Sequence, residues 1–476
     1  MTANKSPHDA SPQAAAGLEL GALARMIELF ARTGPDAIRA DGVQLLPPGP
    51  GESYNATEDL LEWMRRNFER YGDVYQTSLY GQRVYVINSP EAADHVLLRN
   101  WRNYPRKGQA VKRIALSLGN SLISSNGDVW ARQRRMIQPA FKRESIRVFF
   151  DAFLHVSTAL LAKWESAARS GASIDVTLDV SLAVLEATLV AIFGSDYDRV
   201  APNFELIADE SRNLEFAKNC IALGKLVAQI GEDRRRNGVD GNDLLGQMMR
   251  ARDREGGCPM SDAELARHGM TLVIAGHETT ASVLNWIWYL LARHPEAEAR
   301  LGAEIDSLLG DGCLDFDKLT DFVYSRQVIE EALRTYPPLW LMTRKAAAAD
   351  CLGGYFVPAG TEIYISPYLL QRHPRYWEDA DRFDPGRFAP EESHDRPPLA
   401  ACPFGAGPRN CIGEFFARVE MQAHLLLIAR VLRLRYADDR PADFVAGVNL
   451  VSRHHFVMQP ELRQRTGAGR CLHVKL

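Results

Sequence analysis

One short segment, residues 404–413, constrains this chain more than any other. Its sequence, Phe-Gly-Ala-Gly-Pro-Arg-Asn-Cys-Ile-Gly, permits few backbone conformations. Gly405 and Gly407 allow backbone angles that a side chain forbids, and Pro408 fixes one more angle and removes a donor. Apolar residues then recur at helical spacing, so we expect a helix to begin near Cys411. The segment therefore predicts a stiff loop that leads into a helix.

Cys411 is the residue in this loop whose side chain could take part in chemistry. The N-terminus of a helix favours thiolate over thiol, and Arg409 adds a cation two residues upstream. A single anionic sulfur in a rigid loop suits an axial ligand of iron. The alternative is an ordinary buried cysteine, which is the more common state of a free cysteine.

The surrounding pattern favours the ligand. Phe-x-x-Gly-x-Arg-x-Cys-x-Gly, followed by Ala417 and Glu420, resembles the haem-binding loop of the cytochrome P450 family, and all five fixed positions are present. The resemblance implies haem b (iron protoporphyrin IX) with Cys411 as the proximal iron ligand. It also implies that Phe404 packs near the sulfur and that Arg409 pairs with a haem propionate.

A second match lies in the basic stretch 127–143. Trp130 and Arg134 are four residues apart and therefore share a helical face. The family's Trp-x-x-x-Arg motif stands at the matching place, which implies that both side chains reach a propionate. A buried anion needs a cation and a donor, because an unpaired buried charge is costly. The alternative is a solvated helix with a half-buried tryptophan.

Residues 261–293 predict one long helix, capped by Ser261 with Glu264 three residues later. Within it, residues 275–280 read Ala-Gly-His-Glu-Thr-Thr. Glycine in a helix interior costs about 1 kcal/mol relative to alanine, so Gly276 marks a weak point. Close packing against another backbone would explain such a glycine without any chemistry.

The same hexad resembles the family's oxygen-activation motif. The resemblance implies that the helix opens beside the metal, with Gly276 next to the haem and Thr279 holding oxygen and water. Glu278 is then a carboxylate that relays protons to this water. We expect His277 to be a structural or surface residue.

Two further motifs predict a structural cluster. Glu331-x-x-Arg334 alone is a weak signal, because such pairs are usually surface ion pairs. Here it precedes Tyr-Pro-Pro, as in the family, and residues 383–388 match the family's Pro-x-Arg-Phe segment, with Gly386 where Glu is common. The resemblance implies a cluster of Glu331, Arg334 and Arg387 that is architectural and not chemical.

The substrate pocket is less specific in the sequence. A strand that lines it is expected over Leu339, Trp340, Leu341 and Met342. The roof region 195–242 is short compared with the family, with candidate helices at 204–216 and 221–236. This departure suggests a wider entrance, suited to a bulky or tethered substrate.

Composition excludes several classes. The net charge of −4 gives no general affinity for nucleic acid or acidic membrane. Seven cysteines without a C-x-x-C pair argue against a disulfide framework or zinc site and favour the cytoplasm. We find no apolar run near the roughly 18 residues of a membrane span. Residues 1–16 are expected to be a disordered tail, and 17–476 a single domain.

Other segments have clear periodicity. Helices are expected at 18–31, 60–71, 321–335 and 419–434, with two more within 150–194. Residues 73–79 and 83–88 predict a β-hairpin, Ser89 an N-cap, and residues 445–460 a β-rich region.

The fold implied by the resemblance is mainly α with small β-sheets, with haem between the long oxygen-activating helix and the Cys-loop helix. The implied function is a monooxygenase that inserts one atom of O2 into an apolar organic substrate by hydroxylation or epoxidation. The substrate is free or carrier-tethered, in secondary metabolism. Electrons come from NAD(P)H through a ferredoxin- or flavodoxin-type donor. Two alternative functions are a haem-thiolate enzyme that uses peroxide and a non-catalytic haem sensor. The pair of Glu278 and Thr279 argues against the first, and the lack of residues for an output domain argues against the second.

Overall fold

The computed structural model describes residues 46–464, except 52, 80, 109–110, 113–114, 116–117, 204–213, 240, 255 and 439–440. The chain forms two compact units, one of residues 1–108 with 343–366 and one of residues 109–342 with 367–476. Three predictions lie outside the described residues: the tail 1–16, the helix 18–31 and most of the helix 204–216. The prediction of a single domain over 17–476 stays a prediction.

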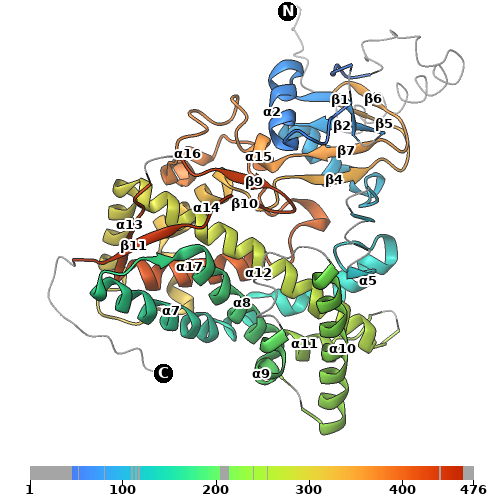
Figure 1. The fold of residues 1–476 in the computed structure, drawn as a ribbon. Coiled ribbons are helices and arrows are strands. Elements are labelled where there is room, and N and C mark those ends of the chain that lie inside the picture. The colour runs from blue at the N-terminus through green and yellow to red at the C-terminus, as the bar shows by residue number, and fades with distance from the viewer. Residues whose placement is uncertain are drawn as a thin grey trace, which may run out of the picture. The chain divides into compact units, whose positions relative to one another are not determined.

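The first unit is built on a four-stranded sheet of order β1-β2-β7-β4, formed by β1 (Val74–Leu79), β2 (Gln82–Ile87), β4 (Met342–Lys345) and β7 (Glu362–Ile365) (Figure 1). β1 and β2 are antiparallel, with Val74 opposite Ile87, which confirms the predicted hairpin. β2 and β7 run parallel. The unit also contains α2 (Leu60–Tyr71), α3 (Pro90–Asp94), η1 (His95–Arg99), η2 (Trp101–Asn103), β5 (Asp350–Leu352) and β6 (Tyr355–Val357). Ser89 caps α3 through its hydroxyl, as predicted.

The second unit is mainly helical. Its helices are α5 (Gly127–Ile137), η3 (Gln138–Phe141), α6 (Arg143–Arg147), α7 (Phe150–Ser170), α8 (Val176–Phe193), η4 (Gly194–Asp196), α9 (Tyr197–Val200), η5 (Ala201–Asn203), α10 (Leu214–Asn237), α11 (Leu244–Arg250), α12 (Asp262–Arg293), α13 (Pro295–Leu308), η6 (Phe316–Asp321), α14 (Val323–Thr335), α15 (Pro367–Leu370), η7 (Pro385–Phe388), α16 (Pro390–Ser393), η8 (Pro398–Ala400), η9 (Gly407–Arg409) and α17 (Glu414–Ala429). Its strands are β3 (Ile174–Asp175), β8 (Leu432–Arg435), β9 (Phe444–Ala446), β10 (Leu450–Ser452) and β11 (Val457–Leu462).

The long helix α12 is central to the second unit and packs against α8, α10, α14 and α17 (Figure 1). Its start is fixed by the predicted capping box, in which Ser261 and Glu264 satisfy each other's backbone N–H groups. Its C-terminal half, residues 280–291, is buried on all sides, as expected of a helix without a polar face. Pro295 then opens α13.

Two predicted elements have different bounds. The helix after the Cys loop begins at Glu414, not near Cys411, and ends at Ala429 instead of residue 434. Leu432–Arg435 alternates buried and half-buried residues, a period of two, and pairs with β11 as a strand. Of residues 339–342, only Met342 lies in a strand.

The expectation that no apolar run is long enough to span a membrane is wrong by length and composition. The helical stretches 143–170 and 176–200 meet both criteria. They contain α7 and α8, which pack against α17 and α12 respectively. Helices of a protein core meet the same criteria, and the most apolar part of the second stretch is 61% buried.

Candidate active site

The loop around Cys411 has the conformation that its glycines predict. Gly405 and Gly407 have φ values of 72° and 69°, which L side chains rarely adopt. The Cys411 amide donates to the carbonyl of Phe404 over 2.9 Å, and the Asn410 amide donates to the Gly407 carbonyl over 3.0 Å. These bonds close the loop on itself and present an exposed Cys411 at its end.

A cavity of about 500 Å³ lies beside Cys411. Five basic side chains and one carboxylate are among the residues that line it, namely Arg134, Arg135, Lys142, Arg254, Arg418 and Glu414. Burial raises the pKa of Glu414, while a hydrogen bond with Asn410 opposes the rise. The surroundings of the sulfur are therefore strongly cationic, and such surroundings favour thiolate.

Trp130 and Arg134 of α5 lie against this loop, which itself contains the third predicted residue, Arg409. The guanidinium of Arg409 lies over the Trp130 ring, 4.0 Å from its centroid, and donates to the Ser125 carbonyl over 2.8 Å. Arg134 donates to the carbonyl and side-chain oxygens of Asn410, both over 2.9 Å. α5 and the Cys loop are thus joined by two arginines.

These residues fit a haem with an anionic periphery. Within the described residues, the hydrogen bonds of Arg134 go to neutral oxygens of Asn410 and Gln138 and not to a carboxylate. Burial lowers the pKa of Arg134, and the nearby Cys411 opposes this shift. A half-buried guanidinium without a carboxylate, beside an exposed sulfur, is the donor set that a propionate and a soft metal require.

The face of α12 at residues 275–280 is partly open. Ala275 and Glu278 are exposed, although they lie in the middle of a long helix. The Thr279 hydroxyl donates to the Ala275 carbonyl over 2.7 Å, four residues back. His277 instead faces α8, where its ring lies 3.0 Å from both oxygens of Ser181. Burial lowers the pKa of His277 to about 4, so it is neutral and structural.

The helix does not open at this point, contrary to expectation. α12 is helical from Asp262 to Arg293 without interruption. A Cβ on Gly276 would lie 3.3 Å from the Thr188 side chain of α8, closer than most side chains approach. A side chain at Gly276 would therefore be crowded by Thr188, and the predicted place of Gly276 next to the haem stays a prediction.

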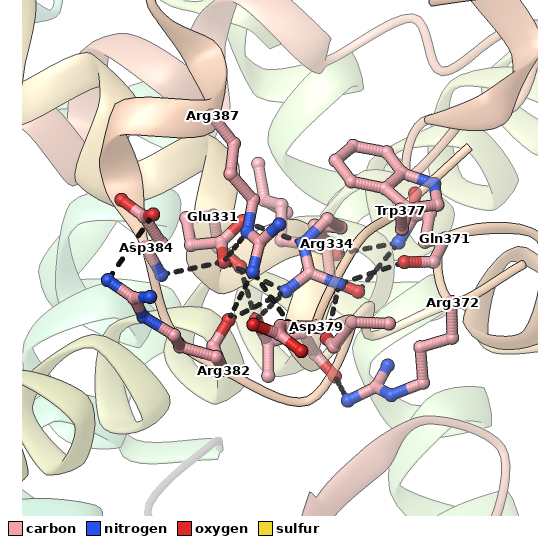
Figure 2. Close-up of polar contacts among 12 residues, drawn as sticks. Glu331, Arg334, Gln371, Arg372, Trp377, Asp379, Arg382, Asp384 and Arg387 are labelled. Carbon is pink, nitrogen blue, oxygen red and sulfur yellow. Dashed lines mark hydrogen bonds and ion pairs between the residues drawn. The ribbon is translucent and has the colours of Figure 1, made fainter. Parts of the chain in front are cut away.

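The predicted residues Glu331, Arg334 and Arg387 lie together (Figure 2). Glu331 and Arg334 have fully buried side chains and form a two-pronged ion pair, with N–O distances of 2.7 and 2.8 Å. Arg387 approaches the same carboxylate to 3.4 Å. Arg334 also donates to the carbonyls of Gln371 and Ala380, so the pair ties α14 to the segment before η7.

The predicted pocket residues are placed differently from one another. The Trp340 side chain is buried and its indole N–H donates to the Gly447 carbonyl over 2.9 Å. The sulfur of Met342 lies 3.4 Å from the position of a Cβ on Gly405, so Met342 packs against the Cys loop. Leu339 is exposed and Leu341 is half-buried.

Sequence reasoning missed several residues around the site. Gln371 donates to the Leu333 and Arg334 carbonyls and accepts from the Cys402 amide, so it links α14 to the approach of the Cys loop. Cys402 is buried, and burial raises the pKa of its thiol to about 12. Arg418 of α17 lies over the Phe404 ring. No motif marks these positions, since their roles depend on tertiary contacts.

Comparisons with known proteins agree with this geometry. The sequence profile described as Cytochrome P450 matches residues 49–220 and 215–455. Cyclooctat-9-en-7-ol 5-monooxygenase of Streptomyces melanosporofaciens is 34% identical over 77% of this chain and 83% of its own length. Pentalenene oxygenase of Streptomyces avermitilis is 32% identical over 86% of this chain and 93% of its own length.

Solved structures give the same result for the fold. The crystal structure of the cytochrome P450DA heme domain superposes with a TM-score of 0.78 at 26% identity, covering 89% of this chain and 99% of that domain. The mainly helical fold with small sheets is therefore confirmed. The chain belongs to the cytochrome P450 family of haem-dependent monooxygenases, which act on apolar substrates with electrons from redox partners.

Proposed function

We propose that Cys411 is the thiolate ligand of a haem b whose propionates are held by Arg134, Arg409 and Trp130. The observation that carries this proposal is that Arg134 bonds to Asn410 of the Cys loop while Arg409 of the loop bonds back to Ser125 before α5. Within the described part of the chain, the hydrogen bonds of Arg134 go to neutral oxygens of Asn410 and Gln138. When bound, the haem supplies the chemistry that activates O2 and attacks a C–H bond or an alkene. The protein supplies position, charge and protons.

We assign the delivery of protons to Thr279 and Glu278 of α12. The Thr279 hydroxyl donates to the Ala275 carbonyl, so its oxygen keeps lone pairs that accept from a water. Glu278 is exposed one residue earlier and carries a carboxylate that exchanges protons with such water. Gly276 keeps α8 and α12 close and thereby fixes the place of this turn.

The electron donor is a ferredoxin- or flavodoxin-type protein. The cavity beside Cys411 is lined in part by the exposed residues Arg135, Lys142 and Arg254, whose positive charges attract a donor with an acidic face. Electrostatic attraction of this kind raises association rates and falls with ionic strength. Such donors and NAD(P)H are cytoplasmic, so we place the enzyme in the cytoplasm.

The substrate is an apolar alkene or alkenol of secondary metabolism, and the product carries one new oxygen. This choice depends on the names of the relatives, a cyclooctat-9-en-7-ol monooxygenase and a pentalenene oxygenase. A carrier-tethered substrate remains the alternative if the roof over 195–242 is as open as its shortness predicts. Screening alkenes, alkenols and carrier-linked acids for a Soret shift on binding distinguishes these classes.

The decisive test concerns the sulfur. Reduced wild-type protein under carbon monoxide should show the Soret band of a thiolate-bound ferrous carbonyl, and Cys411→Ser should lose it. Cys402→Ser is the matched control, because this buried thiol lies nearby and should leave the band unchanged. Folded wild-type protein that binds haem without the thiolate band would refute the proposal.

A further inference from the structure

Arg418 is a half-buried cation on the Cys-loop side of the site that no motif role explains. It lies on the first two turns of α17, seven residues after Cys411, and its side chain is 30% exposed. Burial lowers its pKa to about 10, which leaves the guanidinium charged at neutral pH. A charge held in such a place influences every nearby redox or ionisation equilibrium.

The guanidinium of Arg418 lies over the ring of Phe404, with its central carbon 4.7 Å from the ring centroid. A guanidinium on an aromatic face is an attractive contact that restrains both groups. Phe404 in turn accepts the amide hydrogen of Cys411 through its carbonyl. Arg418 therefore contacts the residue that is hydrogen-bonded to the Cys411 backbone, and it also lines the cavity that contains Cys411.

Two carboxylates balance this cation from different elements. Glu330 of α14, next to the buried Glu331, forms a close ion pair with Arg418. Glu414, one turn earlier on α17, lies 3.1 Å from the guanidinium. The arrangement is a line of groups, from Glu330 through Arg418 to the face of Phe404, that ends at the Cys411 backbone.

We propose that Arg418 is a positioning residue that holds Phe404 against the Cys411 loop and, with its charge balanced by Glu330, sets the reduction potential of the haem iron. This inference depends on the proposed role of Cys411 as iron ligand. A cation near the site stabilises the form that has gained an electron, and a carboxylate near it has the opposite effect. The pair therefore determines how readily the site accepts an electron from its donor.

A purely structural role predicts something different. Loss of packing would disturb the loop in the same way whichever partner is removed, so the reduction potential would move in one direction or not at all. An electrostatic role predicts opposite signs. Arg418→Met removes the cation and should move the potential to more negative values, whereas Glu330→Gln removes one of its two counter-charges and should move the potential to more positive values.

The experiment is spectroelectrochemical titration of the purified holoenzyme variants, with the ferrous carbonyl spectrum recorded on each. Arg418→Lys keeps the charge but loses the planar stacking group, so its potential should lie closer to wild type than that of Arg418→Met. Arg300→Met is the matched control, because Arg300 lies over the Tyr324 ring at 4.3 Å and does not line the cavity that contains Cys411. Its potential should equal that of wild type.

Opposite shifts for Arg418→Met and Glu330→Gln support the inference. Shifts of the same sign, or shifts no larger than that of Arg300→Met, overturn it. If Arg418→Met does not fold, Arg418→Gln takes its place, since a negative shift supports the inference and an unchanged potential overturns it. Absence of the thiolate band in wild-type protein would instead count against the proposed function of Cys411.

Discussion

Replacing Glu331 by glutamine should show how much the buried ion pair of α14 contributes to stability. Glu331 and Arg334 are both fully buried, and the carboxylate also accepts the Asp384 amide hydrogen over 2.9 Å. Glu331→Gln leaves Arg334 as a buried cation without a counter-charge. Removing one partner of a buried pair typically costs about 3–5 kcal/mol, because the remaining charge stays desolvated.

That free energy converts to a modest change in melting temperature, because the chain is long. Unfolding entropy of about 2.1 cal/mol/K per residue gives about 1 kcal/mol/K for 476 residues. We therefore expect Glu331→Gln to lower the Tm by about 3–5 °C. Far-UV circular dichroism of the holoenzyme measures this, and the Soret absorbance followed in the same scan shows whether haem leaves first.

Glu461→Gln is the control for this experiment. Glu461 pairs with Arg433 and Arg435 at a site where its side chain is 40% exposed. Exposed pairs contribute about 0–1 kcal/mol, so its Tm should change by about 1 °C or less. If Glu331→Gln melts no lower than Glu461→Gln, the buried pair does not carry the stability assigned to it.

Three further predictions concern the site and its surroundings. Thr279→Ala should uncouple the enzyme, so that reductant is consumed and peroxide is released with less product. Thr271→Ala, which removes a similar hydroxyl bond to the Arg267 carbonyl, should keep normal coupling. Oxygen, NAD(P)H and product are measured together in both variants. Arg134→Gln should lose haem on gel filtration at least several-fold faster than Arg134→Lys, because the lysine keeps the charge beside Cys411; equal rates would contradict a propionate contact. Burial lowers the pKa of His424 from about 6.5 to about 3, so on acidification this histidine is protonated in the unfolded chain before it is protonated in the folded protein. The stability that the neutral His424 contributes is therefore fully present above pH 6.5 and is lost as the pH falls below that value. His424→Gln, which still accepts from the Trp288 indole, should lose about 2 kcal/mol less stability than wild type between pH 6.5 and pH 5 in urea unfolding; identical acid slopes would refute this.

Local patterns were sufficient for the elements whose boundaries are set by nearby residues. Ser261 and Glu264 lie three residues apart and cap α12 as predicted. The two strands that flank Gly81 pair in antiparallel fashion, as predicted for a hairpin. Prediction failed where contacts between distant segments set the boundary of an element. The end of α17 at Ala429 is set by the pairing of Leu432–Arg435 with β11, which lies some 25 residues further along the chain.

The candidate site shows the same division. Cys411, Arg409 and Trp130 stand in motifs that resemble those of the P450 family, and that resemblance was enough to name them. Arg418 and Gln371 could not, because their partners Glu330 and Cys402 lie on other segments. The sequence marks Gly276 as unusual for a helix interior, but only the position of Thr188 on α8 shows that a side chain there would be crowded.

Cys402 and Cys411 stand nine residues apart but differ in access, since the first thiol is buried and the second is exposed. A mild alkylating reagent should therefore modify Cys411 in protein freed of its cofactor and spare Cys402. Once iron occupies the sulfur, that reaction should stop, so the loaded protein would titrate with one reactive thiol fewer. Counting thiols would then measure the occupied fraction of a preparation independently of any absorbance.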